Sequence, residues 1–400
     1  MLAGLKVLEV SCLHSMLAGQ VLADLGADVI TIEAPSGAPG RREGPFLEGR
    51  LGPDASLAWH SLNRNKRGMT LDIDTPDGQD ILLQLAASVD VVIEPAPARF
   101  AGRLPANVLH CVLRPFSRHG PKSHYAFTDQ ILVASTGAPT YTGDADRRPV
   151  LIPVPQAMME TGAEAAVGIL GALAARDQGH GGQRIDVSAR MAAMMSAFAL
   201  PYVTTANDKP PKRGVGRAPV GDVDIPNVYE CRDGFVLLSI TFGAFAGMTQ
   251  RLVQWLVSCG KVSEDLVGVD WANYPNNVQQ GSVSTAPILS IIEGLTDLAR
   301  TLTKQQIGEA AQKQRFFAAP LMDMGDVAAF DQYEARGLWV ETGLPDGKTV
   351  KAPARFAQFS NFQISQRLPA PSLSEHTREI LAELGFAEQE MQALYHHSII

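Results

Sequence analysis

The chain has 400 residues, of which 46% are hydrophobic and 19% charged, and its formal net charge is −8. This composition excludes a disordered chain, and the acidic balance argues against nucleic acid or an anionic membrane surface as a partner. The four cysteines lie far apart in the sequence, which predicts reduced thiols in a cytoplasmic protein and no cysteine-based metal site.

The first half alternates short β-branched runs with helical periodicity. This rhythm is typical of βαβ units and predicts an α/β fold with a mainly parallel sheet. We expect helices at 16–25, 78–87 and 160–176. The expected strands are 5–10, 28–33, 69–73, 89–94, 108–116 and 184–188.

The second half changes character after a stretch rich in Gly, Pro, Lys and Arg at 209–226, which indicates a domain crossing. Beyond it we expect a strand at 235–240 and helices at 248–257, 288–302 and 374–394. The predicted domains are a large one over 1–210, a smaller α+β one over 226–340, and a segment over 341–400 that returns to the large domain.

Neither a leader nor a membrane span is expected from the sequence. The start of the chain has no basic leader and enters a strand directly. The longest apolar stretch, 165–175, is about half of the roughly 20 residues that a spanning helix needs. We therefore expect it to be a buried helix.

Six segments, taken together and in order, resemble the family III CoA-transferases, also called the CaiB/BaiF family. Each is a common βα sequence by itself, but their order and spacing cover nearly the whole chain. The segments are Leu2–Glu9, Leu22–Glu33, Leu62–Asp72, Gly168–Arg176, Gly182–Ser188 and Ser374–Gly385.

The resemblance implies a fold, an assembly and a reaction. The fold is a Rossmann-like large domain with a small domain, and the assembly is an interlocked dimer. The reaction moves CoA from an acyl-CoA, such as succinyl-CoA, to a carboxylic acid, such as benzylsuccinate. An aspartate carboxylate is the nucleophile. Coenzyme A is then a substrate, and neither a permanent cofactor nor a metal is implied.

The position of the family's aspartate holds a different residue in this chain. The family pattern resembles Asp-x-x-Thr-Gly, and counting back from Thr161 and Gly162 places Met158 in the aspartate position. A thioether cannot form an acyl anhydride. Glu160 is the nearest carboxylate, but in a helix a two-residue offset turns it by about 200° to the opposite face. Glu160 is therefore either a substitute nucleophile or an acidic residue that suits a helix start.

Further departures lie where the family contacts the coenzyme. Ala34 stands where an Arg often follows the second strand, and Pro95 and Ala96 replace an Asn-Phe pair. The racemase branch of the superfamily uses a His and an Asp, and this chain has Thr128 and Met158 in those positions. Proton abstraction beside a thioester therefore has no evident base.

Four residues remain candidates for coenzyme binding. His14 and Ser15 lie where the first strand meets the first helix, a place where backbone N–H groups can bind phosphate. They are either coenzyme contacts or packing and capping residues. Lys66 and Arg67 match the family motif and could contact phosphates, or they could simply hold a turn.

Three functions remain open at this point. The chain is an aspartate-free subunit paired with a homologous aspartate-bearing chain, with CoA bound by that partner; or it is a homodimeric transferase that uses Glu160; or it is a binding protein on the same fold. The first interpretation is preferred, because the interlocked dimer gives a homologous chain the same surface to thread through.

Overall fold

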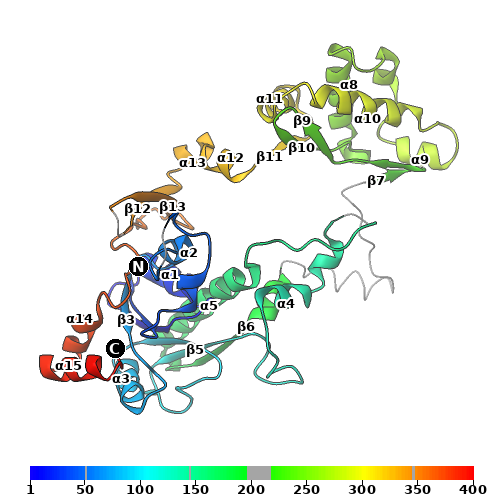
Figure 1. Cartoon of the computed structure of the whole chain (residues 1–400). Helices are drawn as coiled ribbons and strands as arrows, with labels where there is room; N and C mark the ends of the chain where they lie inside the picture. The colour runs from blue at the N-terminus through cyan, green and yellow to red at the C-terminus, as the bar shows by residue number, and fades with distance from the viewer. Residues whose placement is uncertain (50–51, 144–145, 196–217, 345–346) are drawn as a thin grey trace. The chain divides into compact units, whose positions relative to one another are not determined.

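The computed structural model describes residues 1–400 except 50–51, 144–145, 196–217 and 345–346 (Figure 1). The chain divides into two compact units. The larger unit comprises Met1–Pro139, Leu151–Lys209 and Asp331–Ile400, and the smaller comprises Thr140–Val150 and Pro210–Phe330. The chain thus leaves the larger unit twice and returns to it, the second time at residue 331.

A six-stranded parallel sheet forms the centre of the larger unit (Figure 1). The strand order is β3-β2-β1-β4-β5-β6, so the direction of winding reverses between β1 and β4. In sheets of this kind ligands bind at the carboxyl ends of the strands, near such a reversal. The strands are β1 (Lys6–Val10), β2 (Asp28–Glu33), β3 (Lys66–Thr70), β4 (Val91–Pro95), β5 (Leu109–Arg114) and β6 (Arg184–Ser188).

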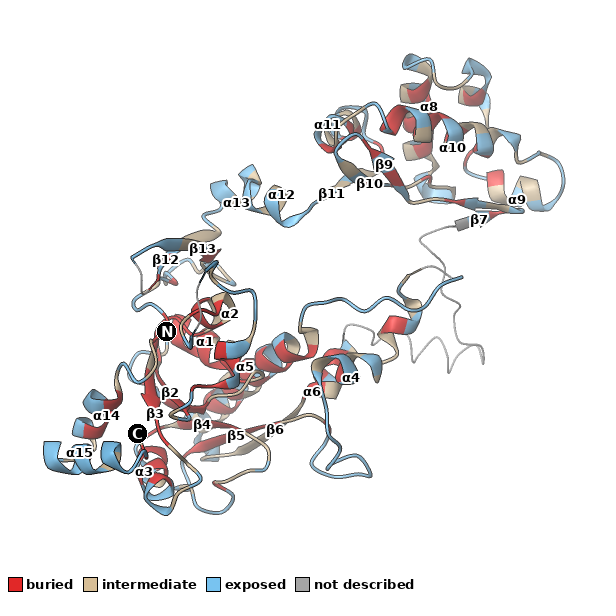
Figure 2. Cartoon of the chain, viewed as in Figure 1, coloured by how far each residue is buried: buried red, intermediate tan, exposed pale blue. Residues whose placement is uncertain are grey.

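Helices cover both faces of this sheet, as the buried residues in Figure 2 show. Alternating strand residues point to opposite faces: Val7 packs with α1 and α5, whereas Leu8 packs with α3, α14 and α15. The helices of this unit are α1 (Met16–Asp24), α2 (Leu57–Leu62), α3 (Pro76–Ala87), α4 (Asp129–Ala134), α5 (Gln156–Ala175), α6 (Ala189–Met194), α13 (Asp331–Ala335), α14 (Thr377–Glu383) and α15 (Glu388–His396). A hairpin of β12 (Trp339–Gly343) and β13 (Thr349–Pro353) belongs to the same unit.

The smaller unit has its own core, built on a three-stranded antiparallel sheet in the order β11-β10-β9. Helices α8 and α10 are amphipathic and bury their apolar faces in this core. The strands are β7 (Ala218–Val220), β8 (Val223–Ile225), β9 (Val228–Cys231), β10 (Gly234–Leu238) and β11 (Ala318–Leu321), and the helices are α8 (Ala246–Ser258), α9 (Tyr274–Gln279), α10 (Ala286–Ala299), α11 (Lys304–Gln314) and α12 (Met324–Ala328). The predicted fold class, a parallel α/β unit with a smaller α+β one, is confirmed.

The strand predicted at 69–73 was displaced. β3 begins at Lys66 and ends at Thr70, so Lys66 and Arg67 are strand residues and do not lie in a turn. Both charged side chains have acidic partners on neighbouring elements, and this pairing lets them occupy a sheet.

Two other predictions needed correction, and a third was incomplete. α5 begins four residues earlier than expected, at Gln156. The single helix expected at 374–394 is two, α14 and α15, separated at Gly385, whose φ of +92° is a left-handed conformation that ends helices. The crossing at 209–226 contains the β7–β8 hairpin from residue 218 onward, and residues 209–217 lie outside the described part.

Helix α5 is also longer than the buried stretch that the sequence predicted. Together with the turn that follows, Gln156–His180 is, within the described residues, the one helix long and apolar enough to cross a membrane by length and composition. Half of its apolar window is buried, and its buried residues pack with α1 and the sheet. A core helix of an α/β protein has the same composition. A cytoplasmic location stays a prediction of the sequence.

Candidate functional site

The candidate site lies where α5 begins beside the loop that joins β1 to α1. Gly162 permits this approach: a Cβ atom there would lie 2.7 Å from Leu17 Cβ and 3.3 Å from the backbone oxygen of His14. The first distance is shorter than carbon atoms allow, so α5 could not pack this closely with a larger residue. The close packing brings the second turn of α5 next to the backbone of His14.

Met158 lies in the first turn of α5, and its side chain is buried with Met16 and Trp59. Its backbone N–H is one of the amides at a helix start that have no partner inside the helix. The amide donates a hydrogen bond to Oδ1 of Asp129, over 2.9 Å. A carboxylate from α4 is therefore held at the residue that occupies the family's nucleophile position in our reading of the sequence.

Glu160 is two residues further along the same helix and is partly buried. Its Oε2 atom is buried without a hydrogen-bond partner. Burial and, secondly, the charge of Asp129 raise the pKa of the Glu160 carboxyl group. The protonated acid is therefore favoured there more than in water.

His14 completes the neighbourhood from the β1–α1 loop. Its ring lies 5.6 Å, centroid to centroid, from that of Phe127, and its Nε2 atom is buried without a partner. Burial lowers the pKa of His14, and the negative charge of Asp129 opposes this shift. His14, Asp129 and Glu160 thus form one electrostatic cluster, which we call the carboxylate–histidine cluster.

Ser15 and Lys66, two of the predicted coenzyme contacts, lie inside a buried network. The Ser15 hydroxyl donates to Glu9 Oε1 over 2.6 Å. The Lys66 ammonium donates to Glu9 Oε2 over 2.7 Å, to the Met16 carbonyl over 2.9 Å and to Asn63 Oδ1 over 2.8 Å. Burial lowers the pKa of Lys66, although the Glu9 carboxylate opposes the shift. All three ammonium hydrogens are used within the chain, so none is available to a phosphate.

Arg67 is likewise engaged by acidic side chains. Its guanidinium pairs with Asp28 over 2.7 Å and with Glu379 and Glu383 of α14 over 2.9 and 2.7 Å. The arginine therefore ties α14 to the edge of the sheet. Of the four predicted coenzyme contacts, only His14 joins the candidate site with an unpaired polar atom.

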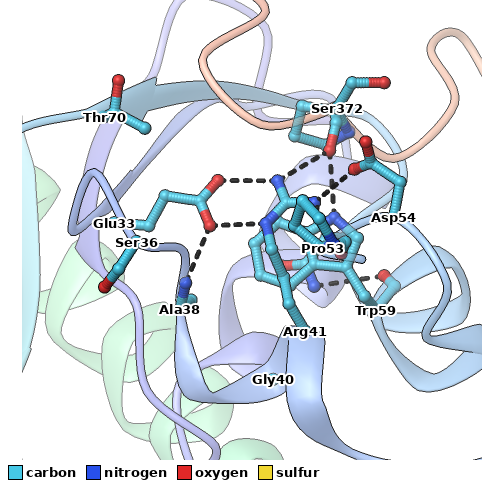
Figure 3. Close-up of polar contacts among 12 residues, drawn as sticks. Glu33, Ser36, Ala38, Gly40, Arg41, Pro53, Asp54, Trp59, Thr70 and Ser372 are labelled. Atoms are coloured by element: carbon cyan, nitrogen blue, oxygen red, sulfur yellow. Dashed lines mark hydrogen bonds and ion pairs between the residues drawn. The ribbon is translucent and has the colours of Figure 1, made fainter. Parts of the chain in front are cut away.

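A second buried network fixes the segment after β2 (Figure 3). Arg41 donates to Glu33 through Nε and Nη2, over 2.6 and 2.7 Å, and its guanidinium lies 3.9 Å from the centre of the Trp59 ring. Arg41 and Trp59 both donate to the carbonyl of Pro371 over 3.0 Å. Glu33 thus has an arginine partner although Ala34 follows it, and this partner is used for structure.

Comparison with known proteins identifies the family to which this chain belongs. The model of CoA-transferase family III matches residues 2–377. The chain belongs to that family. It is 29% identical over 388 residues to the BbsE subunit of succinyl-CoA:(R)-benzylsuccinate CoA-transferase of Thauera aromatica, covering 94% of this chain and 92% of that one. It is 27% identical to the succinate–glutarate CoA-transferase of Agrobacterium fabrum, covering 97% and 96%.

Solved structures agree with this assignment. A CaiB/BaiF family protein from Brucella suis superimposes with a TM-score of 0.77 at 26% identity, over 96% of this chain and 99% of that one. Rv3272 of Mycobacterium tuberculosis superimposes with a TM-score of 0.70 over 94% and 98% of the two chains. At 22% identity, the latter supports the fold alone. The resemblance predicted from the sequence is therefore confirmed for family and fold.

Sequence reasoning missed Asp129 as a member of the site. The residue begins α4 directly after Thr128, whose hydroxyl caps that helix by accepting from the Ile131 amide over 3.2 Å. Read locally, Asp129 is an ordinary acidic residue in a first helical turn. Its partner amide at Met158 lies 29 residues further along the chain, and no local pattern links the two.

Proposed function

We propose that this chain is one subunit of a CoA-transferase that moves CoA from an acyl-CoA, such as succinyl-CoA, to a carboxylic acid, such as benzylsuccinate. Family membership across residues 2–377 supports CoA transfer. Two relatives carry succinyl-CoA or succinate in their names, and one of them is a benzylsuccinate enzyme. The family assignment alone specifies neither these substrates nor this assembly.

The observation that carries the assembly is Met158. Its thioether is packed among apolar side chains at the start of α5, and it cannot attack a thioester to form an anhydride. We propose that a homologous chain with an aspartate at this position supplies the nucleophile for turnover. The similar BbsE chain is itself named as a subunit, which is consistent with a two-chain enzyme.

Exposed apolar side chains support a protein partner for this unit. They lie on α4, α5, α6 and the segment that leads into α5, where apolar exposure of this extent is typical of an interface. The residues are Ile131, Leu151, Ile152, Val154, Met159, Val167 and Met191. We propose that a homologous chain covers them in an interlocked heteromer.

The coenzyme belongs largely to the partner in this proposal. Lys66 and Arg67 are paired within this chain, which leaves His14 as its one predicted contact. Glu160 is less suitable as a substitute nucleophile, because it lies two residues beyond position 158 on the same helix, and this offset turns its side chain by about 200°. These observations favour the heteromer over a homodimer that uses Glu160.

The test is co-expression with a homologous aspartate-bearing chain from the same source. CoA transfer from succinyl-CoA to benzylsuccinate is assayed for each chain alone and for the mixture. We expect sustained turnover from the mixture only. Full turnover by the present chain alone would refute the heteromeric proposal.

A further inference from the structure

A small cavity lies between the segment that follows β5 and the start of α6. Its volume is about 230 Å³. Sites for drug-sized ligands measure roughly 300–1,000 Å³, so this cavity suits a smaller molecule. Its most buried lining residue is Phe116, which packs with Ala157 and Ala189 in the core of the larger unit. The polar lining residues are Ser117, His119, Lys122, Ser123, Ser188 and Arg190.

We propose that this cavity binds a small dicarboxylate, a molecule whose two carboxylate groups are joined by a short carbon chain. One carboxylate binds to Arg190, the other is attracted by Lys122, and the carbon chain contacts Phe116. The site is separate from the carboxylate–histidine cluster and takes no part in the transfer of CoA. The inference therefore goes beyond the proposed function, although succinate and benzylsuccinate belong to the same class of acid.

Arg190 is held on one side of its guanidinium group and keeps donors on the other. Nε donates to the Ser135 hydroxyl over 3.2 Å, and Nη2 donates to the Ser135 carbonyl over 3.2 Å. Nη1 makes no hydrogen bond to any described residue. The edge formed by Nη1 and Nη2 is therefore left for a carboxylate, which arginine binds through two parallel bonds. Because Ser135 is uncharged, these bonds position the guanidinium without neutralising it.

The surroundings of the cavity are cationic although the whole chain is acidic. Residues 115–128 include Arg, Lys and His side chains but no Asp or Glu, whereas the net charge of the chain is −8. On the neighbouring strand β6, Asp186 pairs with Arg114 and with Arg184 over 2.8 Å each, and lies 4.0 Å from Arg118. One carboxylate thus serves three guanidinium groups. The excess of positive charge attracts an anion to this edge of the sheet.

The apolar part of the lining favours a carbon chain over a bare phosphate. The Lys122 ammonium lies 5.9 Å from the centre of the Tyr125 ring, and that ring lies 6.1 Å from the ring of Phe116, centroid to centroid. Cationic and aromatic side chains therefore line the same small space. Methylene groups gain free energy when they leave water for such a surface, whereas a phosphate has none to bury. A dicarboxylate uses both kinds of lining residue.

Calorimetric titration of the chain with succinate, butyrate and inorganic phosphate tests the site. The chain is titrated alone, because Met191 at the cavity is also one of the residues that we assign to the partner interface. Butyrate has as many carbon atoms as succinate but only one carboxylate. We expect succinate to bind at least about tenfold more tightly than butyrate, because butyrate lacks one of the two charge-assisted contacts. Phosphate that binds as tightly as succinate would overturn the inference, and so would the absence of succinate binding at about 10 mM.

Variants place the acid within the molecule. Arg190→Lys keeps the charge but loses the two parallel bonds, and should weaken succinate binding about tenfold. Lys122→Met removes an exposed charge and should weaken it about threefold. Lys313→Met, exposed on α11 in the smaller unit, is the matched control and should bind succinate as the parent chain does. Unchanged affinity in Arg190→Lys or in Lys122→Met would contradict the proposal.

Two controls separate this site from folding effects and from the candidate site. Arg190→Lys changes the bonds to Ser135, so thermal unfolding is measured for every variant. Lys122→Met leaves those bonds intact and keeps the test decisive if Arg190→Lys does not fold. His14→Ala alters the carboxylate–histidine cluster and should not change succinate binding. Loss of binding in His14→Ala would place the acid at that cluster and overturn the inference.

The binding result and the proposed function can fail separately. If the mixed complex does not transfer CoA but the chain binds succinate through Arg190 and Lys122, the dicarboxylate site stands and the proposed function is wrong. If the mixed complex transfers CoA but the chain alone binds no succinate, the proposed function stands and the dicarboxylate site is wrong.

Discussion

The Lys66 network and the carboxylate–histidine cluster differ in how completely their buried polar atoms are hydrogen-bonded. In the network, Lys66 and Glu9 are fully buried, and the ammonium gives each of its hydrogens to an oxygen of the same chain. In the cluster, His14 and Glu160 each keep a buried atom without a partner. The difference separates polar residues that hold the fold from residues whose buried atoms have no partner within the described part of the chain. Changes in the network should therefore affect stability, and changes in the cluster should affect chemistry.

The largest effect on stability is expected from Lys66→Met. This substitution leaves the Glu9 carboxylate buried without its counter-ion, which costs about 3–5 kcal/mol. Urea denaturation at neutral pH measures the loss. Lys6→Met, at the exposed start of β1, is the control and should change the free energy of unfolding by no more than about 0.5 kcal/mol. A loss below about 1 kcal/mol for Lys66→Met would show that the Lys66 network stabilises the fold no more than a surface ion pair does. The contrast with the carboxylate–histidine cluster would then be wrong.

Gly162→Ala should have the next largest effect. A methyl group at Gly162 meets Leu17 Cβ at 2.7 Å, so α5 must move away from α1, at a cost of about 1–3 kcal/mol. Gly171→Ala in the same helix meets nothing within 4 Å and should stabilise the chain by up to about 1 kcal/mol. Thermal unfolding of the two variants, compared with the parent chain, measures both. A stable Gly162→Ala variant with unchanged transfer activity in the complex would show that the close packing beside His14 is dispensable.

Glu160→Gln should give the smallest effect, and it depends on pH. The pKa of Glu160 is raised in the folded chain, so its contribution to stability is present in full at acid pH and is lost as the pH rises through the folded-state pKa. We expect Glu160→Gln to be slightly more stable than the parent at pH 7, with the difference shrinking towards pH 4. Glu164→Gln, exposed on the same helix, is the control and should show no such trend. An advantage of Glu160→Gln that does not change with pH would contradict the shifted pKa.

Much of the fold could be predicted from the sequence, and the exceptions have one cause. β2 and β6 occupy the predicted residues, because β-branched runs bounded by turn residues are local signals. β3 was displaced because Lys66 and Arg67 were interpreted as phosphate contacts or turn residues and not as strand residues. The partner that permits burial of Lys66, Glu9, lies 57 residues away. Asp129 was missed for the same reason, since its partner amide is also distant.

Met158 illustrates the opposite case, in which a local sequence motif predicts the position of a residue but not its partner in the fold. Counting back from the Thr161-Gly162 pair predicts Met158 as the family's aspartate position, and Met158 lies in the first turn of α5. The sequence could not predict that a carboxylate from α4 is bonded to the amide of that same residue. The location of the site therefore stays a prediction of the sequence, and the bond from α4 could not have been predicted from a local pattern.

The central claim is that this chain takes part in CoA transfer without an aspartate at position 158. It is tested most directly by the transfer assay on the present chain, a homologous aspartate-bearing chain and their complex, with succinyl-CoA as donor and benzylsuccinate as acceptor. The account predicts sustained transfer by the complex and none by either chain alone. Equal transfer by the aspartate-bearing chain with and without the present chain would contradict it.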